Sequence, residues 1–109
     1  MSETELQGNI MEALNRHRLV LFCRNNTVGT AKVKGRYITI GKKSDGDIYG
    51  MMKPSGRYFE IEVKLPGEEK KNPERYKQQA QRIVDVRNGG GAAGFATSIE
   101  QAYDIIMEQ

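Results

Sequence analysis

The spacing of apolar residues predicts three helices with strands between them. Near the N-terminus, apolar residues recur at helical spacing after a capping box formed by Ser2 and Glu5, which predicts a helix over about residues 3–17. A second helix is predicted over about residues 73–88, because an Asn-Pro-Glu sequence opens it and a run of glycines ends it. A further capping box begins at Ser98 and opens a third helix.

The buried faces of the last two helices follow from the same spacing. In the second helix, the residues expected to face inward are Tyr76, Ala80, Ile83 and either Val84 or Arg87. In the third helix they are Ile99, Ala102, Ile105 and Ile106. Each helix therefore has one side with which to cover a sheet.

Short apolar or alternating segments predict the strands. These segments are residues 19–23, a hairpin centred on Gly35 over 32–40, residues 47–52, residues 57–65 and a strand of small residues at 92–96. The clearest is 57–65, in which Phe59, Ile61, Val63 and Leu65 share one face, while Tyr58, Glu60, Glu62 and Lys64 share the other. The succession predicts an α/β fold with a mixed β-sheet flanked by helices, in the order α-β-β-β-α-β-α. At 109 residues, the chain is expected to form a single domain over 1–109.

The presence of one Cys and one His limits the chemistry that the chain can support. One Cys excludes an internal disulfide, and one Cys with one His cannot supply the four ligands of a structural zinc site. A metal must therefore be held mainly by oxygen, which favours Mg²⁺ or a similar hard ion. The net charge of +3 permits nucleic-acid binding without establishing it.

The strand over 57–65 carries the candidate chemistry. Its alternation places the carboxylate of Glu62 and the ammonium of Lys64 on one face, roughly 7 Å apart, which on its own is typical of a surface salt bridge. Asp47 opens the preceding strand, and the connecting hairpin can bring it beside Glu62. Because neighbouring carboxylates repel each other, such a pair favours a bound cation.

Glycines and basic residues flank this pair along the sequence. Gly41, Gly46 and Gly50 either thin the surface for the approach of a DNA backbone or serve turn geometry. The basic residues expected to contact phosphates are Lys42, Lys43, Lys53, Arg57, Lys70 and Lys71.

The ordered motifs of the chain are similar to those of a known nuclease family. They are Glu-Thr-Glu-Leu-Gln at 3–7, Arg-Asn-Asn-Thr at 24–27, Gly-Arg-Tyr-Ile-Thr-Ile-Gly at 35–41, Ser-Asp-Gly-Asp-Ile-Tyr-Gly at 44–50, Glu-Ile-Glu-Val-Lys-Leu-Pro-Gly at 60–67 and Gly-Gly-Gly-Ala at 89–92. An Asp followed by Glu-x-Lys on a hairpin resembles the PD-(D/E)xK nucleases. The longer series resembles the virus-type replication-repair nuclease (VRR-NUC) family in its stand-alone phage type, which implies a restriction-endonuclease-like core over nearly the whole chain.

The resemblance implies a divalent-metal site. In it, Asp47 and Glu62 ligate Mg²⁺ or Mn²⁺, with the carbonyl of Val63 as a third oxygen. Lys64 orients the attacking water and stabilises charge on the phosphate. Glu3 completes the site from the first helix, although an acid in a first turn is equally expected from the helix dipole.

Two acidic positions of this site have rivals. The family has Ser or Pro before its catalytic Asp, whereas this chain has Gly46, so Asp45 competes with Asp47. In the first helix, Glu5 is the alternative to Glu3.

The resemblance also implies roles for a glutamine and for the turn after the first strand. The family places a Gln early in the second helix, and Gln79 is preferred over Gln78 and Gln81 because it lies on the inward side. Arg24 and Asn25 contact DNA or a dimer partner, or form a structural turn only.

We therefore expect a divalent-metal-dependent endonuclease that hydrolyses DNA phosphodiester bonds. The resemblance implies structure-specific cleavage of branched DNA, such as Holliday junctions, during phage replication, repair or recombination. Paired cuts need two sites, so a homodimer is expected. No targeting or membrane segment is visible, which predicts a cytoplasmic protein, in the host cytoplasm if the chain is phage-encoded. The alternatives are a non-catalytic nucleic-acid-binding domain and a phage interaction protein whose acid–lysine pairs are surface salt bridges.

Overall fold

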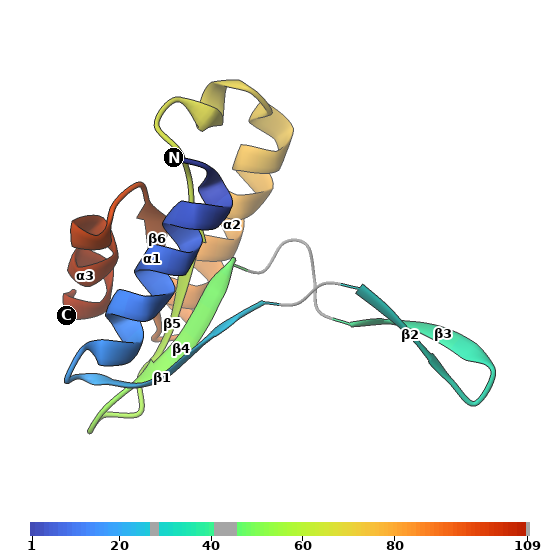
Figure 1. The fold of residues 1–109 in the computed structure, drawn as a ribbon, viewed down its shortest axis with the longest axis horizontal. Helices are drawn as coiled ribbons and strands as arrows, with labels where there is room; N and C mark the ends of the chain where they lie inside the picture. Colours follow the sequence, from blue (N-terminus) through green and yellow to red (C-terminus); the bar gives the residue numbers. More distant parts are fainter. Residues whose placement is uncertain (27–28, 41–45, 109) are drawn as a thin grey trace.

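The chain folds into a mixed α/β structure (Figure 1), seen in a computed structural model that describes residues 1–26, 29–40 and 46–108. The elements, in chain order, are α1 (Glu3–Arg16), β1 (Val20–Asn25), β2 (Gly29–Val33), β3 (Arg36–Ile40), β4 (Ile48–Met52), β5 (Tyr58–Val63), the short 3₁₀ helix η1 (Glu68–Lys70), α2 (Pro73–Asn88), β6 (Ala92–Ala96) and α3 (Ile99–Met107). The predicted α/β class, with a mixed sheet flanked by helices, is confirmed.

Four strands form the main sheet, in the order β1-β4-β5-β6. The pairs β1–β4 and β4–β5 are antiparallel, while the pair β5–β6 is parallel. β2 and β3 form a separate two-stranded sheet, which stands away from the main sheet in Figure 1. The predicted order α-β-β-β-α-β-α thus describes the main sheet, but it omits two of the five described strands between α1 and α2, because the hairpin adds a pair of its own.

The two faces of the main sheet are covered differently. α1 and α3 pack against each other over one face, whereas α2 packs against β5 and β6 on the other. The first face is apolar, since Phe59, Ile61 and Val63 of β5 are fully buried in one core with Ile10 and Leu14. The second face carries the two glutamates of β5, so these side chains lie beneath a helix rather than in water.

The helices begin and end close to the predicted residues, and each of the three predicted N-cap side chains accepts a backbone hydrogen bond of 3.1 Å. The inward face of α3 is confirmed, but that of α2 is partly wrong. Val84 and Arg87 are exposed, whereas Gln79 and Val86 are buried. No helix within the described part of the chain is long and apolar enough to cross a membrane.

Two of the glycines noted in the sequence serve internal packing. A Cβ at Gly50 would lie 2.3 Å from a backbone carbonyl of β1 and 2.5 Å from the ring of Phe59. A Cβ at Gly46 would lie 3.1 Å from the Cβ of Glu60. Both glycines are buried, so the expectation that they thin the surface for DNA is wrong for this pair. Gly41 lies outside the described residues.

Candidate functional site

One end of the main sheet gathers the predicted site residues. Figure 1 shows the first turns of α1 and α2, the start of β4, the end of β5 and the η1 segment converging there. The pairing of Ile48 with Ile61 places Asp47 beside Glu62, as the sequence predicts. Asp47 is held in turn by Val63, whose backbone N–H donates a 2.8 Å hydrogen bond to Oδ2 of the carboxylate.

Glu62 and Asp47 form a carboxyl pair within the fold. Glu62 is only 5% exposed. Burial is the largest influence on its pKa, and the charge of Asp47 and a hydrogen bond between the two carboxyl groups act in the same direction. The positive charges of Lys64 and Arg75 oppose these effects but do not outweigh them, and the pKa of Glu62 is raised to about 9. Without a cation, the pair therefore shares a proton at neutral pH.

Gln79 is the glutamine that the structure brings to this pair. It is 3% exposed, and its Nε2 donates a 2.7 Å hydrogen bond to Oε1 of Glu62. Gln78 and Gln81 are exposed, and Gln81 bonds to Asp85 on the outer side of α2. Among the described residues, Oε1 of Gln79 is the one buried side-chain N or O atom that lacks a hydrogen-bond partner. An acceptor is thus available next to the carboxyl pair.

Lys64 and Glu3 border the pair, as predicted. The ammonium of Lys64 lies 5.9 Å from the ring centroid of Phe95. Its positive charge partly opposes the rise in the pKa of both Glu62 and Glu3. Burial is the largest of the effects that raise the pKa of Glu3 to about 7, followed by a hydrogen bond with Glu68 and the charges of Glu68 and Asp47.

The structure decides one of the two alternatives among the acidic residues. Glu5 is exposed, and its carboxylate accepts a hydrogen bond from the hydroxyl of Ser2, so it serves the helix cap rather than the site. Asp45, the rival of Asp47, lies outside the described residues.

The end of β1 supports Asp47. Arg24 and Asn25 are the last two residues of this strand and pair with β4, so the alternative that they form a turn is wrong. Nε2 of Gln7 donates to Oδ1 of Asn25 at 2.9 Å and to the backbone carbonyl of Asp47 at 3.4 Å. The backbone N–H of Asn26 donates to the same carbonyl at 2.8 Å. Arg24 instead bonds to the carbonyl of its own neighbour and lies over the ring of Phe22. Asn25 therefore helps to hold Asp47, which is a structural role.

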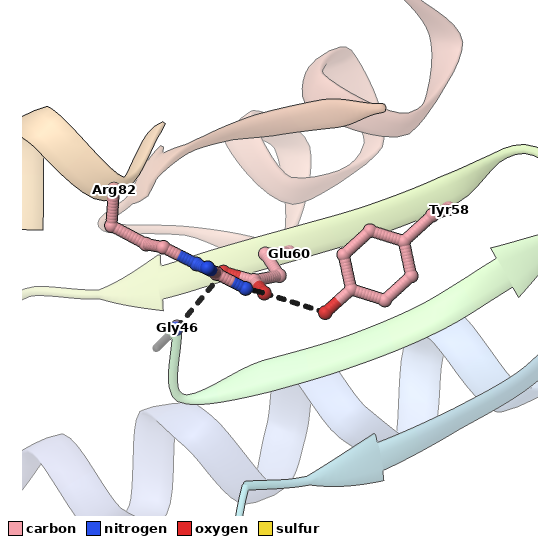
Figure 2. A network of polar contacts seen from close by, with 4 residues as sticks. All are labelled: Gly46, Tyr58, Glu60 and Arg82. Carbon is pink, nitrogen blue, oxygen red and sulfur yellow. Dashed lines mark hydrogen bonds and ion pairs between the residues drawn. The ribbon is translucent and has the colours of Figure 1, made fainter. Parts of the chain in front are cut away.

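A second buried network lies on the same face of β5 (Figure 2). Glu60 is 3% exposed and accepts hydrogen bonds from Arg82 at 3.0 and 2.5 Å, from the hydroxyl of Tyr58 at 2.5 Å and from the backbone N–H of Gly46 at 3.1 Å. Burial alone raises the pKa of Glu60, but these donors outweigh it and the net shift is downward. Because Gly46 immediately precedes Asp47, the network also anchors the start of β4.

Sequence reasoning missed several of these residues. Glu68 lies in a charged loop of the sequence and Arg75 in a first helical turn, where either charge is unremarkable. Only the fold brings Glu68 to Glu3 and Arg75 close to Glu62. The pairing of Glu60 with Arg82 joins β5 to α2, so no local pattern marks it. The one usable signal was the alternation that puts Glu60 and Glu62 on the same face of the strand.

The basic residues fall into three groups. Lys70 ends η1 and Lys71 follows it, and both are exposed at the same end of the sheet as the site. Lys42 and Lys43 lie outside the described residues. The prediction that Lys53 and Arg57 surround the site is wrong, because both lie at the end of β4 and β5 that is farther from Asp47 and Glu62. There, Arg57 donates hydrogen bonds to the backbone carbonyls of Gly90, Gly91 and Glu108.

The donor atoms at this site are oxygens, the type of ligand that a hard divalent cation prefers. Carboxylates with raised pKa values and an unused amide oxygen are oxygen ligands that a cation can stabilise. Within residues 1–26, 29–40 and 46–108, however, no three His, Cys, Asp or Glu side chains already form a group able to hold a metal. Val63 contributes its N–H to Asp47, and its carbonyl as a metal ligand stays a prediction.

Comparison with known proteins does not add to this geometry. No model of a known protein family matches the chain, and no curated protein matches it either. The resemblance to the VRR-NUC family therefore stays a prediction that rests on the motifs.

Proposed function

We propose that the chain is a Mg²⁺- or Mn²⁺-dependent endonuclease that hydrolyses DNA phosphodiester bonds. The observation that carries the proposal is the buried carboxyl pair of Asp47 and Glu62, in which the pKa of Glu62 is raised to about 9. A fold that keeps two carboxyl groups together in this way is suited to bind a cation, since binding relieves their repulsion.

Each side chain of the site has a distinct part in this proposal. Asp47 and Glu62 hold the ion, which, when bound, lowers the pKa of a water and polarises a phosphoryl oxygen. Lys64 presents its ammonium to the phosphate and orients the attacking water. Gln79 fixes the Glu62 carboxylate through its Nε2 and offers its free Oε1 to a water. Glu3 adds a carboxylate from the other side of the site.

Branched DNA and a homodimer belong to the same proposal. The described part of one chain has one such carboxyl pair, so one copy cuts one strand, and two strands of a junction require two copies related by a two-fold axis. Lys70 and Lys71 supply positive charge beside the site for the flanking phosphates.

Cleavage of four-way-junction DNA in Mg²⁺ or Mn²⁺ tests the proposal. We expect cleavage by the parent, none in EDTA, and a loss of at least about 100-fold in Asp47→Asn, Glu62→Gln and Lys64→Met. Glu12→Gln, which removes an exposed acid on the outer side of α1, is the matched control and should cut like the parent. Full activity in Glu62→Gln would refute the site assignment.

A non-catalytic DNA-binding domain is the second candidate. It is favoured by one observation, namely that no ready three-ligand metal group exists among the described residues. Binding to junction DNA without cleavage in either Mg²⁺ or Mn²⁺ would support this candidate over the nuclease.

A further inference from the structure

The β2–β3 hairpin is exposed on both of its faces. Within the described ranges, its strands pair only with each other, and every residue from Lys32 to Ile38 is exposed. Tyr37 is 75% exposed, and Val33 is 47% exposed. Because an isolated two-stranded hairpin is at best marginally stable in water, these exposed groups indicate a surface that is completed by a partner.

The charge of the hairpin indicates the chemistry of that partner. Between residues 29 and 40 the chain has three cations and no acid. The cations are Lys32 and Arg36, one on each strand, and Lys34 at the tip. Lys32 lies opposite Tyr37 in the register, with its ammonium 5.8 Å from the ring centroid, so one face presents a cation together with an aromatic ring. A polyanion that also offers flat apolar groups fits this surface.

The dimensions of the hairpin fit a DNA groove. The two strands of the hairpin lie about 4.8 Å apart, and five residues per strand make a ribbon about 16 Å long. The major groove of B-DNA is about 12 Å wide and admits a two-stranded β-ribbon. The hairpin of a second copy is a poorer occupant of this surface, because it would bring cations against cations.

The roots of the hairpin lie at the proposed site. β1 ends at Asn25, and the backbone N–H of Asn26 bonds to the carbonyl of Asp47. β3 leads back, through residues 41–45, to Gly46 and Asp47. A DNA duplex held by the hairpin is therefore tethered close to the carboxyl pair.

We infer that the β2–β3 hairpin is a DNA-binding arm that lies in the major groove beside the cleavage site. This inference rests on the proposed function for its substrate, but it concerns binding and is tested without metal. Lys32, Lys34 and Arg36 contact phosphates, and Tyr37 lies against the bases or sugars.

The first test measures the salt dependence of binding to a fluorescein-labelled DNA duplex in EDTA. Each lost phosphate contact lowers the slope of log K against log salt by about 0.9. We expect the triple variant Lys32→Gln/Lys34→Gln/Arg36→Gln to lower the slope by between about 2 and 3 and to bind at least about 100-fold more weakly at low salt.

A matched control removes the same charge from the other end of the molecule. Arg16→Gln/Arg18→Gln/Lys53→Gln changes exposed positions near the end of α1 and after β4, remote from the hairpin roots. Its slope should fall by less than about 1. Equal slopes for the two triple variants would overturn the inference, as would a hairpin variant that changes oligomeric state while binding DNA like the parent.

The second test places a reporter on the hairpin. The chain contains no Trp, so Tyr37→Trp gives a single fluorophore on the arm, and Met107→Trp gives one on the exposed surface of α3. DNA should quench the first and leave the second unchanged, whereas no quenching of the first would overturn the inference. Arm-dependent binding without cleavage would refute the nuclease alone, and cleavage with arm-independent binding would refute the arm alone.

Discussion

Replacing Glu62 by Gln should stabilise the metal-free protein at neutral and alkaline pH, although it removes a proposed metal ligand. The Gln side chain keeps an oxygen to accept the hydrogen bond from Gln79, and its amide can donate to Asp47. The substitution therefore retains the contacts of the protonated carboxyl group while removing the possibility of a second negative charge.

The sign and size follow from the pKa of Glu62. The pKa is raised from 4.5 to about 9 on folding, so the folded state binds this proton more tightly than the unfolded state. The stabilisation is complete below pH 4.5 and is lost as the pH rises through about 9. Each pH unit in that window costs about 1.4 kcal/mol, so the parent is destabilised by about 3 kcal/mol at pH 7.

Urea unfolding in EDTA, at about pH 4.5 and about pH 8, measures this difference. The free energy of unfolding of Glu62→Gln should match the parent at the lower pH and exceed it by several kcal/mol at the higher pH. Glu12→Gln should follow the parent at both. Because the raised pKa of Glu3 is common to parent and variant, it cancels in the comparison.

Adding Mg²⁺ or Mn²⁺ should narrow this difference in unfolding free energy. The parent should gain stability at about pH 8, by about 2.7 kcal/mol when the ion is at 100 times its Kd, while Glu62→Gln gains little. Equal stability of parent and variant in EDTA at both pH values would show that the carboxyl pair is not strained, and the reasoning would fail.

Three further predictions concern the framework of the site. Arg82→Met should cost about 3 kcal/mol of unfolding free energy because it leaves the carboxylate of Glu60 buried without its guanidinium, and Glu60→Gln/Arg82→Met should recover part of the loss in urea unfolding. Since the pKa of Glu60 is lowered, its stabilisation is present above pH 4.5 and lost as the pH falls, so Glu60→Gln should flatten the acid side of the stability profile. Gly50→Ala should cost about 3 kcal/mol because its Cβ collides with the ring of Phe59, whereas Gly8→Ala, with open space on α1, should gain up to about 1 kcal/mol in thermal unfolding; equal effects would contradict this account of Gly50.

The sequence predicts best where a local pattern decides the structure. The capping side chains locate the helix starts, and the alternation in β5 identifies its apolar face. The prediction is partly wrong for α2, because this helix packs polar as well as apolar side chains inward. Gln79 and Arg82 bond to the glutamates of β5, and Val84 is exposed.

The other differences between the predicted and the observed structure arise from how the elements are arranged in space. Val33 and Ile38 alternate with polar residues as strand residues in a core do, so nothing local shows that their hairpin stands apart from the main sheet. The neighbourhood of Asp47 and Glu62 was predictable, since one hairpin joins them. Contacts between distant segments, such as Glu3 with Glu68, depend on how the helices pack against the sheet, which no local pattern shows.

The two glutamates of β5 show why the site is better explained by a ligand than by stability. Glu60 and Glu62 lie two residues apart on one face, and both are at least 95% buried. Glu60 is neutralised inside the protein, because Arg82 and two further donors surround it and lower its pKa. Glu62 instead faces the carboxylate of Asp47, and its pKa is raised. On the same strand, the negative charge of Glu60 is thus balanced by donors within the protein, whereas Glu62 is kept neutral by a proton at neutral pH. A divalent cation could take the place of that proton between Glu62 and Asp47.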